Sequence, residues 1–505
     1  MPDPASDPAA SEVVPEVVPE VVRGGGSGAA VPVVIQGGMG AGVSGWRLAQ
    51  AVARTGQLGV VSGVALDVIM ARRLQRGDPG GHVRRALGRY PEPETARRVL
   101  DRYFVPGGIE PGTPFRPVPR LGLRPNRARD ELIAAANFAE VWLAKQGHGG
   151  PVGINYLEKI QLATPPAVYG AMLAGVDYVL MGAGIPTEIP ALLDALARRA
   201  VAELSVTVAD TDVNDTVAFD PATLTGSAAA PPLRRPSFLA IVSAAVLAQY
   251  LCRSPATRPD GFVMETPVAG GHSAPPRGRM RLDETGEPIY GPRDRIDLAK
   301  VAALGLPFWL AGGYATPDGL AAARSAGAAG VQAGTAFALC RESGIDPALR
   351  QRLLRQAAAG ALKVRNDPYA SPAGFPFKVA DLPGTLSDDI IYADRARLCD
   401  LGFLRTPYRK PNGAAGYRCP AEPVDIYIRK GGSAADATGR RCLCNALIAN
   451  VGLGRHRPDG YAEPPLITLG QDLAFLRDLP GDYSAADVID YLLTHEPGSG
   501  AGPVT

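Results

Sequence analysis

Short apolar runs that end in glycine alternate with helical stretches along most of the chain, and this alternation is the strongest constraint on its fold. We expect strands at 31–39, 58–63, 151–157, 178–184, 204–210, 261–272, 307–314 and 330–337. Continuously apolar runs are typical of parallel strands that are covered on both faces. Helical stretches lie between them, for example at 46–55, 131–147, 167–175, 189–200 and 319–327. Eight alternations predict an α/β fold, a (β/α)8 TIM barrel, with a doubly wound open sheet as the alternative.

Four segments depart from this pattern. Residues 1–30 carry a tandem EVVP repeat followed by GGGSG, which predicts a disordered tail. We expect the barrel to span residues 31–360. Within it, the segment 66–128 is too long for one crossover and carries many Arg at helical spacing, which indicates an inserted helical lid. Residues 211–236 are rich in Pro and Ala and predict a loop. Residues 361–505 show no further strand–helix pairs, so we expect an irregular C-terminal extension that packs on the barrel.

Charge and composition exclude several classes of function. The chain has 52 Lys and Arg against 50 Asp and Glu, a net charge of +2, which leaves no broad basic field for nucleic acid or anionic lipid. No apolar run reaches the roughly 18 residues of a membrane span, and the N-terminus lacks the features of a secretory signal. We therefore expect a cytoplasmic protein with a small-molecule substrate and no nucleic-acid or membrane partner. The oligomeric state, including a homo-oligomer, stays open.

The cysteines are few for the length of the chain. Six in 505 residues do not form a disulfide scaffold. Four of them lie in the predicted extension, at Cys399, Cys419, Cys442 and Cys444. Four thiolates could hold zinc or an iron–sulfur cluster, but the paired C-x2-C spacing of such sites is missing. We therefore predict small buried thiols and no bound metal.

Glycine-rich loops follow the predicted strands, where a barrel places its active site. Gly38 and Met39 lie in the first of these loops, and Gly270 and Gly271 follow the strand at 261–272. The seventh and eighth strands end in Gly312-Gly313 and Gly334-Thr335, the strand ends at which barrels commonly bind phosphate. The pattern favours a cofactor or substrate that carries phosphate, although glycines can also serve only as tight turns.

Three polar side chains at strand ends are candidates for chemistry. His272 follows two glycines, and a neutral imidazole can accept a proton or donate a hydrogen bond. Asn155 and Gln332 end apolar strands, and their amides can bind a planar ring through paired donor and acceptor groups. The alternatives are an exposed loop histidine and amides that bind only the local backbone.

The motifs IQGGMG, GINYL, AGGH, LAGGY and VQAGTAF, in this order across residues 32–345, resemble the nitronate monooxygenase (2-nitropropane dioxygenase-like) family of FMN-containing (β/α)8 barrels. The resemblance implies that the FMN phosphate lies on Gly312, Gly313, Gly334 and Thr335. It implies that Met39, Asn155 and the Gly270–Gly271 turn approach the flavin ring, and that Gln332 and Ala333 lie in the FMN-binding stretch. The family histidine beside flavin and substrate matches His272.

The sequence also departs from this family. Glu265 stands where members often carry a Gln that contacts the flavin, and a carboxylate cannot donate as an amide does. The insert at 66–128, the long segment after His272 and the extension exceed the compact barrel, so we expect a differently built substrate pocket.

Three hypotheses for function follow. The first is an FMN-dependent oxidoreductase that oxidises a small nitronate, nitroalkane or similar carbanionic substrate with O2, with His272 as its catalytic residue. The second is an FMN-dependent enoyl-thioester reductase that uses NAD(P)H, with the Arg-rich insert docking a phosphopantetheine or an acidic carrier. The third is a binding or assembly protein without catalysis, which the complete set of glycine motifs disfavours.

Overall fold

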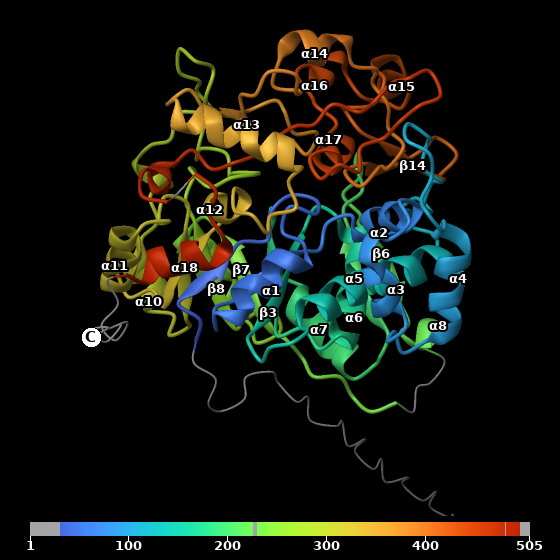
Figure 1. Cartoon of the computed structure of the whole chain (residues 1–505), viewed down its shortest axis with the longest axis horizontal. Helices are drawn as coiled ribbons and strands as arrows, with labels where there is room; N and C mark the ends of the chain where they lie inside the picture. The colour runs from blue at the N-terminus through green and yellow to red at the C-terminus, as the bar shows by residue number, and fades with distance from the viewer. Residues whose placement is uncertain (1–30, 226–229, 480, 495–505) are drawn as a thin grey trace, which may run out of the picture.

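The computed structural model describes residues 31–225, 230–479 and 481–494. It comprises a barrel of parallel strands, a helical insertion on one side and a C-terminal extension over one end (Figure 1). The predicted tail at residues 1–30 lies outside the described residues.

Eight parallel strands form the barrel, in the spatial order β1-β10-β9-β8-β7-β4-β3-β2. The ring closes between β1 and the residue before β2, where Gln36 and Leu58 are joined by a 2.9 Å backbone hydrogen bond. This closure distinguishes the fold from the open sheet and confirms the predicted (β/α)8 TIM barrel. The strands are β1 (Val34–Gln36), β2 (Gly59–Ser62), β3 (Val152–Leu157), β4 (Tyr178–Gly182), β7 (Ser237–Val242), β8 (Gly261–Glu265), β9 (Phe308–Ala311) and β10 (Gly330–Ala333).

The prediction for the fifth barrel strand is wrong. The run at 204–210 contributes to β5 (Ala202–Val206), which pairs antiparallel with β6 (Asp215–Phe219) as a separate hairpin. Burial alternates along β5, as expected for a strand with one face towards solvent, and its sequence alternates in the same way. The barrel strand at this position is β7, whose run SFLAIV follows the segment that was predicted to be a loop. That segment also holds β6 and α8 (Ala222–Thr225).

Helices between the strands form the outer layer of the barrel. Most of their apolar faces form one core with the outward-facing strand residues, and the last two of them pack in a second core with part of the C-terminal extension. They are α1 (Trp46–Arg54), α5 (Arg127–Ala144), α6 (Thr164–Leu173), α7 (Ile189–Ala197), α9 (Ala245–Leu251), α10 (Leu298–Ala302), α11 (Pro317–Ser325), α12 (Thr335–Ala338) and α13 (Pro347–Ala358), with short 3-10 turns η2 (Gln161–Ala163) and η3 (Pro292–Asp294).

A different, apolar cluster fills the barrel interior. Trp309 is its largest side chain, and its indole N–H donates to the Pro32 carbonyl over 2.8 Å. Aliphatic residues from strands around the ring complete this cluster, so the barrel is a packed core and not a pore.

The segment predicted as a helical insert leaves the barrel after β2. It contains α2 (Leu66–Gln75), η1 (Pro79–Gly81), α3 (His82–Leu87) and α4 (Pro93–Tyr103). α2, α3 and α4 pack against α5. They therefore widen one side of the barrel (Figure 1).

The C-terminal extension has two short hairpins and several short helices. β11 (Val364–Asp367) pairs with β12 (Phe377–Ala380), and β13 (Thr406–Arg409) pairs with β14 (Ala415–Arg418). The helices are α14 (Asp389–Asp394), α15 (Val424–Arg429), α16 (Ala434–Ala437), α17 (Leu443–Ala449), η4 (Ala474–Arg477) and α18 (Ala485–Leu493). α18 returns to pack against α1 and α11 of the barrel (Figure 1).

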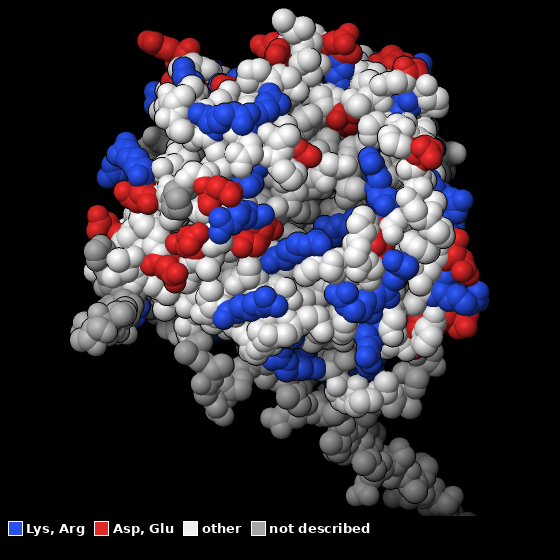
Figure 2. Space-filling view, viewed as in Figure 1, with Lys and Arg blue, Asp and Glu red and all other residues white. Residues whose placement is uncertain are grey.

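Two further observations concern partners. Basic and acidic side chains are interspersed over much of the face in Figure 2, with several basic ones gathered at its lower centre. Among the described residues, none of the helices combines the length and apolar character that a bilayer span needs.

One small cavity of the extension is lined by its four cysteines, Cys399, Cys419, Cys442 and Cys444. In the described part of the chain, no group of His, Cys, Asp or Glu is arranged to hold a metal ion.

Candidate functional site

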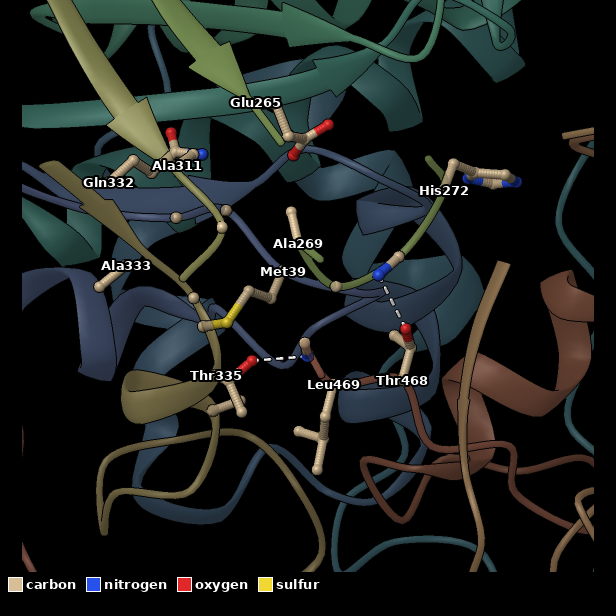
Figure 3. A pocket seen from close by; sticks show the side chains of 18 of the residues that line it. Met39, Glu265, Ala269, His272, Ala311, Gln332, Ala333, Thr335, Thr468 and Leu469 are labelled. Carbon is tan, nitrogen blue, oxygen red and sulfur yellow. Dashed lines mark hydrogen bonds between the residues drawn. The ribbon is translucent and has the colours of Figure 1, made fainter. Parts of the chain in front are cut away.

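A cavity of about 200 Å³ opens at the carboxyl ends of the barrel strands, and we call it the mouth cavity. All thirteen residues that the sequence predicts for a site line it (Figure 3). They come from six separate stretches of chain and meet because the carboxyl ends of parallel strands lie at one end of a barrel. The thirteen are Gly38, Met39, Asn155, Glu265, Gly270, Gly271, His272, Gly312, Gly313, Gln332, Ala333, Gly334 and Thr335.

The loop after β1 is held in shape by two buried polar side chains. Ser44 accepts the Met39 N–H over 2.8 Å and donates to the Gly37 carbonyl over 3.0 Å. Gln36 donates to Ser44 over 2.9 Å and accepts from the Val60 N–H over 2.9 Å. These contacts fix the backbone that carries Gly38 and Met39 into the cavity.

Glycine is required at two of the predicted positions. A Cβ on Gly38 would lie 2.4 Å from the Asn155 Cβ, so only glycine lets the two strand ends approach this closely. Gly312 has a φ of +85° and would place a Cβ 2.4 Å from the Thr266 hydroxyl. The Gly312–Gly313 turn therefore bends sharply and leaves backbone, not side chain, at the cavity surface.

The two strand-end amides each carry an unsatisfied oxygen. Asn155 donates from Nδ2 to the Gly38 carbonyl over 3.0 Å, but its buried Oδ1 has no partner among the described residues. Gln332 Oε1 is likewise buried without a partner there. Buried polar atoms are rarely left unpaired, so two in one cavity indicate a ligand with hydrogen-bond donors. A flavin ring offers an N–H donor together with acceptors for amide N–H groups, and the residues present fit it.

The extension contributes to the end of the cavity that is predicted to bind phosphate. The Gly470 N–H donates to Thr335 Oγ1 over 2.7 Å, and the Gly271 N–H donates to Thr468 Oγ1 over 2.9 Å (Figure 3). The Gln471 N–H also bonds the Val268 carbonyl over 3.0 Å. Residues 468–472 thus form a strap that joins the loop of β8 to the loop of β10.

An acidic side chain in the strap was not expected. Asp472 lines the mouth cavity beside Gly313, with its Oδ2 3.7 Å from where a Gly313 Cβ would stand. No ion pair to Asp472 is found within the described residues, and its Oδ1 accepts the Ala474 N–H over 3.0 Å. A carboxylate here opposes a phosphate bound to the same loop.

His272 lies at the rim of the cavity, with its ring directed away from Met39 (Figure 3). Its Nε2 is 2.7 Å from the hydroxyl of Ser371, a fully buried residue of the extension. The ring also packs edge-on against Phe377, with 4.9 Å between ring centroids. Burial, together with the weaker effect of the Lys159 ammonium, lowers the pKa of His272 to about 4. The imidazole is therefore neutral at pH 7.

β12 sets the position of the loop that carries His272. Lys378 donates its N–H to the Gly271 carbonyl over 2.9 Å, and Ser273 donates to the Pro376 carbonyl over 3.0 Å. The Lys378 ammonium is fully buried and bonds the Pro267 carbonyl over 2.5 Å. The hydrogen bonds from this part of the extension therefore fix the conformation of the loop that follows β8.

Glu265 ends β8 and lines the mouth cavity. Burial raises the pKa of its carboxyl to about 7, while the Lys378 ammonium opposes that rise. At neutral pH a substantial fraction is therefore protonated and can donate a hydrogen bond. This removes the objection that a carboxylate cannot serve at this position.

Sequence reasoning missed the contributions of the extension to the site. They are Phe377, Leu447, Thr468, Leu469, Gly470, Asp472 and Phe475, which line the cavity, and Ser371, which bonds His272. No spacing in the sequence links them to the barrel motifs. The one local signal is a glycine between polar residues in TLGQD at 468–472, which is weak.

Comparison with known families supports the predicted resemblance. Residues 235–367 match the family described as nitronate monooxygenase. The matched segment holds β7 to β11, including His272, Glu265 and the glycine turns after β9 and β10. The match confirms the resemblance seen in the sequence motifs and indicates a flavin-dependent oxidoreductase. No curated protein sequence matches the chain.

Several solved structures are similar over most of their length. FabK from Thermotoga maritima is 16% identical, with 92% of each chain covered and a TM-score of 0.44. Nitroalkane oxidase from Streptomyces ansochromogenes is 16% identical, with 92% of this chain and 96% of that chain covered and a TM-score of 0.44. The enoyl reductase domain of MlnA from Bacillus amyloliquefaciens is 11% identical, with 92% and 94% covered and a TM-score of 0.42. Likenesses this distant leave the substrate open.

Proposed function

We propose that this chain, a flavin-dependent oxidoreductase that resembles nitronate monooxygenases over residues 235–367, binds FMN and oxidises a small nitronate or similar carbanion with O2. The observation that carries the proposal is the pair of unpartnered amide oxygens on Asn155 and Gln332, in a cavity that is also lined by the glycine loops at the strand ends. When bound, FMN would supply the two-electron redox chemistry.

The residues present would hold the two ends of the cofactor at opposite ends of the cavity. The glycine turns after β9 and β10 and the Thr335 hydroxyl would hold the phosphate. Asn155, Gln332 and Glu265 would bond the edge of the ring, with Met39 and the Gly270–Gly271 turn against it. The strap at 468–472 would restrict water at the phosphate end, because it bridges the two loops there.

The low pKa of His272 favours a substrate that is already an anion when it binds. An imidazole with a pKa near 4 is a poor base for removing a proton from a neutral nitroalkane at pH 7, because the best catalytic pKa lies near the working pH. A neutral imidazole that donates a hydrogen bond can still bind a nitronate oxygen and stabilise negative charge there. The Lys159 ammonium, close enough to affect the His272 pKa, adds positive potential at this rim.

The test is the visible spectrum of the purified protein reconstituted with FMN, followed anaerobically after addition of a nitronate and, separately, of NADPH. We expect the nitronate to bleach the flavin bands. His272→Gln should keep the bound flavin and slow its reduction by about 10²–10³-fold. The matched control is His148→Gln, since His148 bonds the Ala144 carbonyl at the opposite end of the barrel and should not affect the rate.

Three outcomes would contradict the proposal. Failure of the purified protein to bind added FMN would contradict any flavin-dependent function. Bleaching by NADPH and not by nitronate would identify a reductase and point to enoyl-thioesters. A His272→Gln variant with the wild-type rate would remove His272 from the reaction.

A further inference from the structure

Glu265 separates two cavities. On one side it lines the mouth cavity, and on the other it lines a cavity of about 20 Å³ that we call the side cavity. Ser243, Thr266, Tyr290 and Asp294 line the side cavity, together with Ala274, Pro267, Pro275 and Arg277. Pro275 and Arg277 are exposed, so the side cavity reaches towards the surface, and its volume is sufficient for one water.

The Glu265 carboxyl has no protein partner to hold it in one protonation state. Within the described part of the chain, neither of its oxygens accepts or donates a hydrogen bond or joins an ion pair, and only the field of Lys378 reaches it. Lys378 itself donates to the Pro267 carbonyl and, over 3.2 Å, to the Ser273 hydroxyl. An unpaired carboxyl between two cavities is free to gain a proton from one and lose it to the other.

From this arrangement we infer that Glu265 is the proton-transfer residue of the site, which carries protons between the flavin in the mouth cavity and solvent in the side cavity. The inference rests on the proposed function, because a flavin that cycles between oxidised and reduced forms must exchange protons. The balance is simple. Glu265 would give its proton to the bound flavin as the flavin takes up two electrons, would become a carboxylate, and would regain a proton that bulk solvent supplies through the side cavity, so that solvent loses one proton for each proton delivered.

The other titratable groups around Glu265 interact with other parts of the protein. The Tyr290 hydroxyl donates to the Ala274 carbonyl over 2.9 Å, and the Asp294 carboxylate accepts the N–H groups of Arg277 and Gly291 over 2.8 and 2.7 Å. His272, on the other side, bonds Ser371. Lys378 lies behind the loop and is the cation that limits how far the Glu265 pKa rises. Burial also lowers the pKa of Lys378 to about 8, so Glu265 and Lys378 are the two groups here whose charge changes near neutral pH. Of these two, Glu265 is the one that lines both cavities.

The first test needs no substrate. The visible spectrum of the FMN-loaded protein is titrated across neutral pH, and we expect a one-proton shift of the flavin bands in the wild type that is lost in Glu265→Gln. His272→Gln should keep this shift, because the pKa of His272 lies far lower. The same shift in wild type and Glu265→Gln would overturn the inference.

The second test is independent of flavin. Infrared difference spectra of the apo-protein, wild type minus Glu265→Gln, should contain a protonated-carboxyl band that disappears as the pH rises through neutrality. Failure to bind FMN would refute the proposed function and leave this band unchanged, whereas a missing band would refute the inference alone. In turnover, Glu265→Gln should retain FMN and lose about 10²-fold in rate together with the pH dependence near neutrality. An unchanged rate would also overturn the inference.

Discussion

The Gly470 N–H donates a 2.7 Å hydrogen bond to the hydroxyl of Thr335, a residue 135 positions earlier in the chain. Thr335 begins the turn after the last barrel strand, and Gly470 belongs to the C-terminal extension. This bond ties the extension to the loop that is predicted to bind phosphate. The cavity is therefore built jointly by the barrel and by a segment that the barrel motifs do not include.

The first prediction concerns this bond. Thr335→Val removes the hydroxyl that accepts from Gly470 and that would also contact the FMN phosphate. One hydrogen bond contributes about 1 kcal/mol, so we expect FMN to bind about five- to tenfold more weakly. Fluorescence quenching of added FMN measures the affinity. Thr335→Ser should restore most of it, and a Thr335→Val variant that binds FMN as tightly as wild type would show that the hydroxyl is irrelevant.

The second prediction concerns Asp472, whose carboxylate lies beside Gly313. Asp472→Asn removes a negative charge close to the proposed phosphate position and keeps an oxygen to accept the Ala474 N–H. We expect tighter FMN binding by about tenfold. Riboflavin, which has no phosphate, is the matched ligand and should bind equally to both proteins. An equal gain for riboflavin would place the phosphate elsewhere.

The third prediction separates affinity from stability at Gln332. Gln332→Leu removes a buried oxygen that has no partner in the described part of the chain. The apo-protein should unfold at an unchanged or higher temperature, because an unsatisfied polar atom has gone. FMN and riboflavin should both bind about tenfold more weakly, because the proposed ring contact is lost. A lower melting temperature of the apo-protein would instead assign Gln332 a structural role.

The fourth prediction follows from the lowered pKa of His272. The folded pKa is about 4 and the ordinary value is 6.5, so the unfolded chain binds the proton more tightly. The contribution of the neutral ring to stability is therefore present above pH 6.5 and is lost as the pH falls towards 4. Relative to His272→Gln, the wild type should lose up to about 3 kcal/mol over this interval. Urea unfolding at several pH values measures this, and parallel curves for the two proteins would contradict it.

Much of the fold could be predicted because it is encoded locally. Seven of the eight barrel strands were expected near their observed positions, since each is a short apolar run and most of these runs end in glycine. The prediction misplaced the remaining strand because two neighbouring runs, at 202–208 and 237–242, both lie where the fifth barrel strand is expected. The alternation of Glu203, Ser205 and Thr207 with apolar residues marks the run at 202–208 as a one-sided hairpin strand, and the unbroken SFLAIV of β7 marks the barrel strand.

The candidate site, like the fold, could be predicted from the sequence only in part. The residues at strand ends could be found because parallel strands carry their carboxyl ends to one place, whatever loops intervene. The contributions of Ser371, Lys378 and the strap could not. Thr468 meets Gly271 across 197 positions, and such a contact leaves no periodic pattern in either segment.

The sequence by itself determined which side chains and which flexible turns face the barrel mouth, because strand periodicity and glycine placement are local properties. The tertiary structure alone decided what those groups do there. The Glu265 pKa depends on burial and on the distant Lys378, and the shape of the His272 loop depends on pairing with β12. The electrostatics of a site arise from everything that packs around it, and that packing is set only when segments far apart in the chain come together.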